Sequence, residues 1–119
     1  MQDEVEFAGQ LTIDDIKQLA AQGVKTFICN RPDGEEPGQP FAKDLQTTAE
    51  LLGASFYMIP LATGVAPSQT LLQQYADAYA QSAKPVVAFC RSGRRSSVIH
   101  YSAKPLIEQL LSSSKQPGN

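Results

Sequence analysis

Val86-Val87-Ala88-Phe89-Cys90-Arg91-Ser92-Gly93-Arg94-Arg95-Ser96-Ser97 is the stretch that decides both the fold and the candidate site of this chain. Its first half is apolar and ends in a cysteine, and its second half holds one glycine and three arginines. The last two serines stand before Val98 and Ile99, where a helix can begin. This order predicts a buried strand, a tight loop and the N-terminus of a helix, with Cys90 at the junction.

Cys90 has the sequence surroundings of a reactive thiol. A loop that leads into a helix can direct several backbone N–H groups to one point, and the helix dipole adds positive potential there. Such surroundings lower a cysteine pKa from about 8.5 to between roughly 3.5 and 7.5, so Cys90 is a candidate nucleophile. We expect Arg91, Ser92, Gly93 and Arg94 to form the anion-binding loop. The alternative is a buried structural thiol beside solvated arginines.

Composition limits the class of protein and of ligand. The 119 residues are enough for one domain, 1–119, with a real core. A net charge of −2 argues against general nucleic-acid binding, so the basic loop favours a small anion such as phosphate, sulfate or a sulfane-sulfur donor. Two distant cysteines without metal-ligand spacing argue against a disulfide framework or a metal site, and a single histidine argues against a His-based catalytic triad. We expect no cofactor.

The expected location is the cytoplasm, without membrane association. No stretch of the sequence is apolar for long enough to span a membrane. The first seven residues are too acidic for a signal peptide, and a leader removed earlier would leave no trace in this sequence.

The pattern of apolar residues and breakers predicts alternating strands and helices. The strands are expected at 5–8, 24–29, 55–61 and 86–89, and the helices at 12–23, 42–52, 67–82 and from Ser96, with an interruption or kink at Pro105 and fraying over 112–119. This alternation is typical of an α/β domain with a mainly parallel sheet of four to five strands. Ligands of such sheets bind beyond the carboxyl ends of the strands, where Cys90 and the loops 30–40 and 62–66 would meet.

The Cys90 loop resembles the active-site loops of cysteine-dependent phosphatases and of their sulfur-transferring relatives, the rhodaneses. The wider chain resembles a bacterial family of beta-lactamase hydrolase-like proteins, in their phosphatase-like domain. The matching segments are Gly9–Thr12, Gly23–Pro37 and Phe89–Ser96. The resemblance implies a cysteine-phosphatase-like fold and, in related proteins, a metallo-hydrolase-like partner domain.

Loop length separates the two activities that the resemblance implies. Four residues lie between Cys90 and Arg95, whereas the phosphatases have five and the rhodaneses have the form Cys-Arg-x-Gly-x-Arg found here. Arg95 is the expected oxyanion-binding arginine, and a register with Arg94 in that role stays open. Ser96 matches the hydroxyl that assists the leaving thiol in many phosphatases, and it is equally suited to cap the helix.

A phosphatase also needs a general acid. In the dual-specificity phosphatases that this chain resembles, the acid is an Asp at the position held here by Thr63. Asp33, Glu35 and Glu36 are the nearest substitutes, and the alternative for them is a solvated acidic turn.

Three functions are therefore weighed. The leading hypothesis is a phosphatase-like hydrolase that uses a Cys90 thiolate, because the resemblance covers most of the chain. Loop length and Thr63 favour a rhodanese-like sulfurtransferase that carries a persulfide on Cys90. The third hypothesis is a non-catalytic oxyanion-binding module.

Residues outside the loop carry weaker predictions. Cys29 ends a strand that, in the fold the chain resembles, lies beside the strand before Cys90, so Cys29 is either a redox partner of Cys90 or a core residue that points away. We expect Arg31 to pair with Glu35 or Glu36. His100 is interpreted as a surface or packing residue rather than a base.

Overall fold

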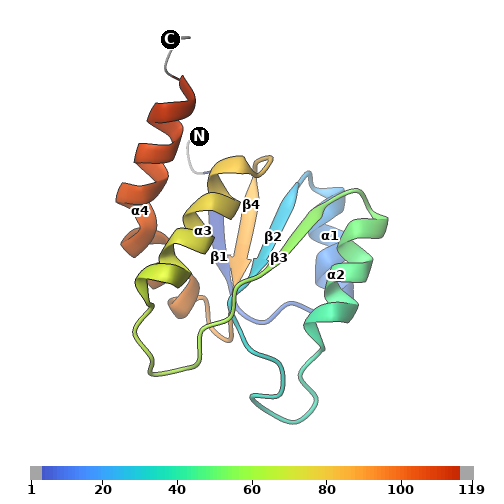
Figure 1. The fold of residues 1–119 in the computed structure, drawn as a ribbon. Helices are drawn as coiled ribbons and strands as arrows, with labels where there is room; N and C mark the ends of the chain where they lie inside the picture. Colours follow the sequence, from blue (N-terminus) through green and yellow to red (C-terminus); the bar gives the residue numbers. More distant parts are fainter. Residues whose placement is uncertain (1–3, 116–119) are drawn as a thin grey trace.

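The predicted strands form one parallel sheet. The computed structural model describes residues 4–115. The strands are β1 (Val5–Ala8), β2 (Thr26–Cys29), β3 (Ser55–Met58) and β4 (Val86–Phe89), in the spatial order β1-β4-β2-β3 (Figure 1). Every neighbouring pair is parallel. The predicted α/β fold is therefore confirmed, with a four-stranded, all-parallel sheet and residues 5–8 at one edge.

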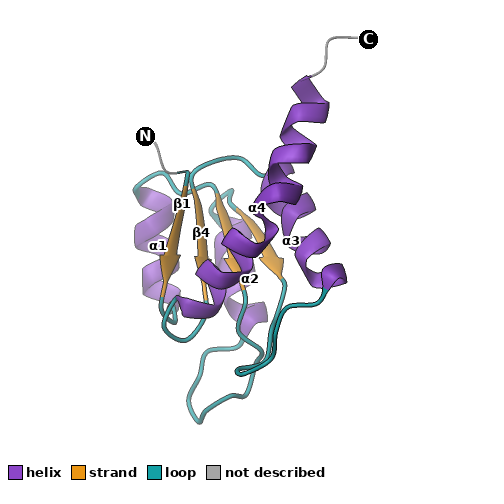
Figure 2. Cartoon of the chain, turned by 90° about the vertical axis from the view of Figure 1, so that its left-hand side faces the viewer, coloured by secondary structure: helices purple, strands orange, loops and turns teal. Residues whose placement is uncertain are grey.

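Helices cover both faces of this sheet. The described residues form α1 (Ile13–Ala21), α2 (Ala42–Leu51), α3 (Gln69–Gln81) and α4 (Arg94–Lys115). Figures 1 and 2 show α1 and α2 on one face and α3 and α4 on the other. The domain thus has three layers, as expected of parallel strands joined by helical crossovers.

Each layer boundary has its own apolar core, and β4 contributes to both. Val86 and Ala88 pack on the side of α3 and α4, whereas Val87 and Phe89 pack on the side of α1 and α2. All four side chains are at most 2% exposed. Full burial of such a side chain stabilises the fold by about 1.5–3 kcal/mol, which explains why the strand before Cys90 is apolar throughout.

Local sequence signals start and end the helices as predicted. Thr12 and Asp15 form a reciprocal capping box at the start of α1. Gly23 follows this helix with a φ of +107°, a conformation that glycine adopts without strain. Ser68 accepts a hydrogen bond from the Leu71 N–H and so caps α3.

Two strands are shorter than predicted, for local reasons. The Val24 N–H still donates to the Leu19 carbonyl of the preceding helix, so β2 begins at Thr26. β3 ends at Met58 because Pro60 has no N–H, although the N–H groups of Ile59 and Leu61 continue to bond β2 and the residue after it.

The last helix differs more from the prediction. α4 begins at Arg94, so Ser96 lies within its first turn and the prediction of Ser96 as the N-cap is wrong. The helix is continuous through Pro105, so the interruption that we expected does not occur. Tyr101 and Pro105 are both exposed, and water can solvate the Tyr101 carbonyl that Pro105 cannot bond. α4 extends beyond residue 111, where we expected fraying, and residues 116–119 lie outside the described residues.

No helix in the described part of the chain is both long and apolar enough to cross a membrane.

Candidate active site at the Cys90 loop

Cys90 lies at the carboxyl edge of the sheet, directly after an interior strand. Its backbone N–H donates to the Ala8 carbonyl at the end of β1, and the Arg91 carbonyl accepts from the Gln10 N–H. Gly93 turns the chain into α4 with a φ of +95°, and its N–H donates to the Cys90 Sγ at 3.1 Å. The loop is therefore held by β1 on one side and by a glycine-specific turn on the other.

The electrostatics of this loop favour the thiolate. Burial alone would raise the pKa of Cys90, which is only 1% exposed. The backbone N–H groups of Ser96, Ser92, Gly93 and Arg95 outweigh burial and bring the pKa below its ordinary value. The direction agrees with the prediction of a reactive thiol.

Arg95 is held beside Cys90 by two loops. Its Nη1 and Nη2 donate to the two oxygens of Glu35 at 2.7 and 2.9 Å, and Nη1 also donates to the Leu61 carbonyl at 2.8 Å. Its side chain is 13% exposed. The Nε–H and the second Nη2–H have no partner among the described residues, so one edge of the guanidinium is available to an anion.

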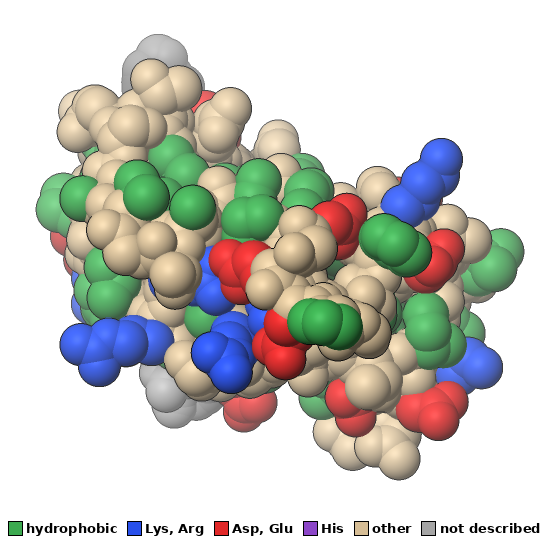
Figure 3. Space-filling model, turned by 90° about the horizontal axis from the view of Figure 1, so that it is seen from below, with side chains coloured by type: hydrophobic (Ala, Val, Ile, Leu, Met, Phe, Trp, Pro, Cys, Tyr) green, Lys and Arg blue, Asp and Glu red, His purple; other side chains and the backbone are tan. Residues whose placement is uncertain are grey.

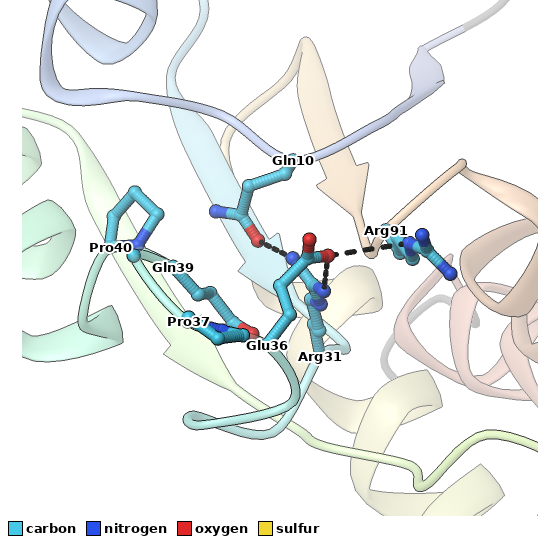
Figure 4. Close-up of a pocket in the computed structure, with 8 residues that line it drawn as sticks. Gln10, Arg31, Glu36, Pro37, Gln39, Pro40 and Arg91 are labelled. Atoms are coloured by element: carbon cyan, nitrogen blue, oxygen red, sulfur yellow. Dashed lines mark hydrogen bonds and ion pairs between the residues drawn. The ribbon is translucent and has the colours of Figure 1, made fainter.

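A second, buried arginine, Arg31, also binds Glu35 of the Glu35–Arg95 ion pair. Arg31 is 2% exposed, and it donates to Glu35, Glu36 and the side chain of Gln10. The pairing that we predicted for Arg31 is thus confirmed with both glutamates. Figure 4 shows Glu36 between Arg31 and Arg91, with an Arg91–Glu36 distance of 3.4 Å.

The remaining arginines of the loop point outward. Arg91 has a side chain that is 71% exposed, and Arg94 is exposed as well. Seen from the carboxyl edge of the sheet, basic and acidic side chains meet at the centre of the face (Figure 3). Among the cavities at this edge, one of about 330 Å³ lies beside Gln10, Arg31 and Glu36 (Figure 4). A second, of about 350 Å³, is lined by Thr63, Glu35, Glu36 and three arginines, and a third, of about 320 Å³, by Thr63, Arg91, Ser92, Arg94 and Arg95.

Two of the three candidate acids are held as carboxylates, and the third is bound at the start of a helix. Hydrogen bonds from Arg95 and Arg31 outweigh burial and lower the pKa of Glu35 to about 2. The hydrogen bond from Arg31 and the charge of Arg91 lower the pKa of Glu36. Asp33 accepts a hydrogen bond from the Ala42 N–H at 2.8 Å and so caps α2 from the preceding loop.

Two buried polar atoms have no partner within the described part of the chain: the Ser96 Oγ and the Asn30 Oδ1. Both residues are 0% exposed. Cys29 is the register partner of Phe89, which places Asn30 beside Cys90 in the next position along the sheet. From the sequence, Asn30 was expected at the site only as part of the loop 30–40, and Gly9 and Gln10 were noted only as part of a segment similar to the family. Their signal was their position directly after strands, which is where ligands of a parallel sheet bind.

Cys29 lies in the apolar core between the sheet and the helices α1 and α2. It packs with the cluster of α1 and α2, and its thiol donates to the Arg31 carbonyl at 3.4 Å. Burial raises the pKa of Cys29 to about 11. Cys90, in contrast, accepts hydrogen bonds from the first turn of α4, on the opposite side of the sheet. Both cysteines are free thiols.

Metal-binding geometry is absent from the described residues, where no three His, Cys, Asp or Glu side chains gather around one point.

The fold and the loop together define a phosphatase-like α/β domain with a cysteine at the end of an interior strand. The chain belongs to the family described as beta-lactamase hydrolase-like protein, phosphatase-like domain, whose model matches residues 1–106. It is 34% identical over 98 residues to the beta-lactamase hydrolase-like protein of Agrobacterium fabrum strain C58, and 29% identical to that of Xylella fastidiosa strain Temecula1. Each match covers 82% of this chain and 22% of the relative, so the chain spans about a fifth of these longer proteins.

Solved structures agree with this assignment. A protein of Neisseria meningitidis Z2491, provisionally described as a phosphatase, is 32% identical with a TM-score of 0.73, covering 82% of this chain and 69% of that one. The core catalytic domain of the PP-IP phosphatase Siw14 from S. cerevisiae, in complex with citrate, has 18% identity and a TM-score of 0.61, covering 98% and 74%. At that identity, the second likeness concerns the fold alone. The family and the cysteine-phosphatase-like fold that the sequence implied are thus confirmed.

Proposed function

We propose that this domain transfers sulfur through a persulfide on Cys90. The observation that carries the proposal is that each of the three carboxylates near the cysteine is already bound by the protein: Glu35 by Arg95, Glu36 by Arg31, and Asp33 by the Ala42 N–H. Glu35 has a pKa of about 2, the pKa of Glu36 is lowered by two arginines, and Asp33 is bonded to the N-terminus of α2. Hydrolysis of an alkyl phosphate ester requires protonation of the leaving oxygen, whereas sulfur transfer between thiolates does not.

The hydrogen-bond donors of the loop also favour a sulfur anion. Four backbone N–H groups, from Ser92, Gly93, Arg95 and Ser96, lower the pKa of Cys90 and so act on the sulfur. The terminal sulfur of a persulfide on Cys90 would lie within the loop whose residues Ser92 and Arg95 line a cavity with Thr63. Its negative charge would be held by the dipole of α4 and by the available edge of Arg95.

The reaction has two balanced steps. The Cys90 thiolate attacks the outer sulfur of a donor such as thiosulfate; a Cys90–sulfur bond forms, the sulfur–sulfur bond of the donor breaks, and sulfite leaves with the electron pair. A thiolate acceptor then attacks the terminal sulfur of the persulfide. The Cys90–sulfur bond breaks, its electron pair returns to Cys90, and the acceptor leaves as a persulfide.

The test is direct detection of the intermediate. Purified protein is incubated with thiosulfate and analysed intact by mass spectrometry, with Cys90→Ser and Cys29→Ser as controls. We expect one added sulfur atom in wild type and Cys29→Ser, none in Cys90→Ser, and thiocyanate after cyanide is added. No added sulfur on Cys90, together with turnover of an aryl phosphate, would refute sulfur transfer.

Phosphoryl hydrolysis is the second candidate, favoured by the phosphatase-like family and by the phosphatase description of the Neisseria structure. Cys90 would attack phosphorus, the available edge of Arg95 would bind two oxygens, and water would hydrolyse the thiophosphoryl intermediate. Without a proton donor, the substrates would be limited to those with a good leaving group, so an aryl phosphate should react and an alkyl phosphate should not. Sulfate binding by a protein inactive in both assays would instead favour the non-catalytic module.

A further inference from the structure

Asn30 is a buried amide that the proposed reaction does not use. It directly follows β2, and its backbone N–H donates to the Phe89 carbonyl at the end of β4, so it lies beside Cys90 at the carboxyl edge of the sheet. The residue is 0% exposed. Burial of an amide is unfavourable unless hydrogen bonds compensate for the lost water, so the contacts of this side chain indicate its role.

Only one end of this amide is bonded. The Asn30 Nδ2 donates to the Ile59 carbonyl at 2.8 Å, whereas the Oδ1 has no partner within residues 4–115. Removing the side chain would therefore leave no donor of the described residues without its acceptor, but it would take the Nδ2–H away from the Ile59 carbonyl. The polar function of this amide in the fold is thus to connect the end of β2 to the segment after β3.

The chain after β3 continues to pair with β2 beyond the end of the strand. The Ile59 N–H donates to the Cys29 carbonyl at 2.9 Å, and the Leu61 N–H donates to the Asn30 carbonyl at 3.0 Å. Pro60 lies between these two residues and has no N–H to donate. The carbonyl that Asn30 binds belongs to the peptide that precedes this proline, so the side chain holds a peptide unit that cannot donate to the sheet.

Leu61 connects this segment to the site. Its side chain is buried in the core on the side of α3 and α4, and its carbonyl accepts from the Arg95 Nη1 at 2.8 Å. The other anchor of Arg95 is the carboxylate of Glu35, at the end of a side chain. Leu61 instead offers a backbone carbonyl whose residue is bonded to the sheet. The position of the guanidinium is therefore set by the end of β2 through Leu61.

We propose that Asn30 is a positioning residue for Arg95. By holding the Ile59 carbonyl, its amide fixes the Leu61 carbonyl and, with it, the guanidinium edge that binds the substrate anion. Asn30 does not touch the anion in this role. The inference deepens the proposed function and rests on anion binding by Arg95, which sulfur transfer and phosphoryl hydrolysis share.

The experiment measures anion affinity without turnover. Cys90 is alkylated with iodoacetamide at increasing sulfate concentrations, the product is identified by mass spectrometry, and the protection gives the dissociation constant of sulfate. Asn30→Leu removes the donor and keeps a side chain of similar length, and Asn30→Ser removes it without adding an apolar group. In both variants the dissociation constant should rise about five-fold, the change expected for the loss of one hydrogen bond.

The pH midpoint of Cys90 alkylation without sulfate separates positioning of Arg95 from general damage. This midpoint should stay at its wild-type value in both Asn30 variants, because the backbone N–H groups that lower the pKa of Cys90 belong to its own loop and to the first turn of α4. Damage to the whole loop would change the midpoint and the sulfate affinity together.

Thr26 provides the matched control at the opposite end of the same strand. It is also 0% exposed, and its Oγ1 donates to the Ala83 carbonyl at 2.9 Å. Thr26→Val therefore removes a buried hydrogen bond from a side chain to a carbonyl far from the site. It should lower the free energy of unfolding in urea as the Asn30 variants do, with no change in sulfate affinity.

Each contrary result overturns a stated part of the inference. Wild-type sulfate affinity in a folded Asn30 variant would refute the positioning role, as would an equal loss of affinity in Thr26→Val. A shifted alkylation midpoint in the Asn30 variants would refute an effect through Arg95. Absence of sulfate protection in wild type would overturn anion binding by Arg95. A failure of Cys90 to take up sulfur from thiosulfate is detected separately and would refute sulfur transfer alone.

Discussion

The carboxylate of Glu35 and the guanidinium of Arg95 form a bidentate ion pair, with Oε2–Nη1 and Oε1–Nη2 distances of 2.7 and 2.9 Å. The two residues are sixty positions apart in the sequence. The pair fixes the plane of the guanidinium, so that one edge is held by the protein and the Nε edge has no partner among the described residues. Glu35 is therefore a positioning residue for Arg95.

Replacing Glu35 with Gln should weaken catalysis without removing the nucleophile. The amide group of Gln cannot accept all three charge-assisted bonds that Glu35 receives from Arg95 and Arg31, and we expect a loss of stability of about 1–3 kcal/mol and a roughly ten-fold lower rate of persulfide formation. Glu50→Gln, on the exposed side of α2, is the matched control and should leave the stability and the rate unchanged. An unaltered rate in Glu35→Gln would contradict the positioning role.

Arg95→Lys should lose most activity because an ammonium group cannot bind Glu35 and an anion through two separate edges, whereas Arg94→Lys should retain activity.

The pKa of Cys90 can be read from the pH dependence of its alkylation. The rate of reaction with iodoacetamide should have a midpoint below about 8.5, the ordinary value for cysteine. Gly93→Ala should raise that midpoint, since alanine is strained at a φ of +95° and the Gly93 N–H bonds the sulfur. Gly53→Ala places the same strain, at a φ of +85°, outside the site and should not alter the midpoint. A wild-type midpoint at or above 8.5 would remove the basis for a nucleophilic Cys90.

Cys29 is expected to stay out of the redox chemistry of Cys90. Its side chain lies in the core of α1 and α2, and burial raises its pKa to about 11, so it is a poor partner for an oxidised Cys90. Under mild peroxide, wild type and Cys29→Ser should therefore lose activity at the same rate. Detection of a Cys29–Cys90 disulfide by mass spectrometry would overturn this prediction and restore the redox-partner hypothesis.

His100 makes the stability of the fold depend on pH. Its ring is buried among Phe7, Tyr75, Tyr79 and Tyr101, and its Nδ1 lies 2.8 Å from the Tyr75 hydroxyl. Burial lowers the pKa of His100 from 6.5 to about 4, and the charge of Lys104 adds to the shift. The unfolded chain therefore binds the proton more readily, and the stability from a neutral His100 is complete above about pH 6.5 and is lost as the pH falls toward 4.

The corresponding measurement is urea unfolding at several pH values. The free energy of unfolding of wild type should fall by up to about 3 kcal/mol between pH 7 and pH 4, because the pKa of His100 is about 4 in the fold and 6.5 in the unfolded chain. His100→Gln, which keeps an acceptor for the Tyr75 hydroxyl, should have a flatter dependence over this range. The stability that the Glu35 carboxylate provides is lost mostly below that range, as the pH falls from about 4.5 to about 2. If the free energy of unfolding of His100→Gln depends on pH as strongly as that of wild type, a group other than His100 is responsible.

Local chemistry made much of the fold predictable. The capping box at Thr12, the glycine at position 23 and the apolar run into Cys90 act over a few residues, and each is found where the sequence placed it. The start of α4 was misjudged because the two serines resemble a cap. The turn at Gly93 instead lets the helix begin at Arg94.

The arrangement of the site was harder to predict from the sequence, because its contacts join loops that are distant along the chain. Asp33, Glu35 and Glu36 were candidate acids by type. Only the structure places Asp33 at the N-terminus of α2 and Glu35 against Arg95. Nothing local marks Gln10 as a partner of Arg31, or Leu61 as a carbonyl acceptor for Arg95. Such roles follow from the order of strands in the sheet, which brings the loops together.

The interior position of β4 in the sheet determines which parts of the domain can unfold locally and which parts can accept new sequence. β4 is hydrogen-bonded to β1 on one side and to β2 on the other, so releasing its backbone requires two ladders to break at once. Amide hydrogen exchange along β4 should therefore report global unfolding, while the exposed loop at 62–66 exchanges freely. A domain built in this way can acquire new loop sequences around its entrance, by mutation or by grafting, while the sulfur of Cys90 stays where the sheet puts it.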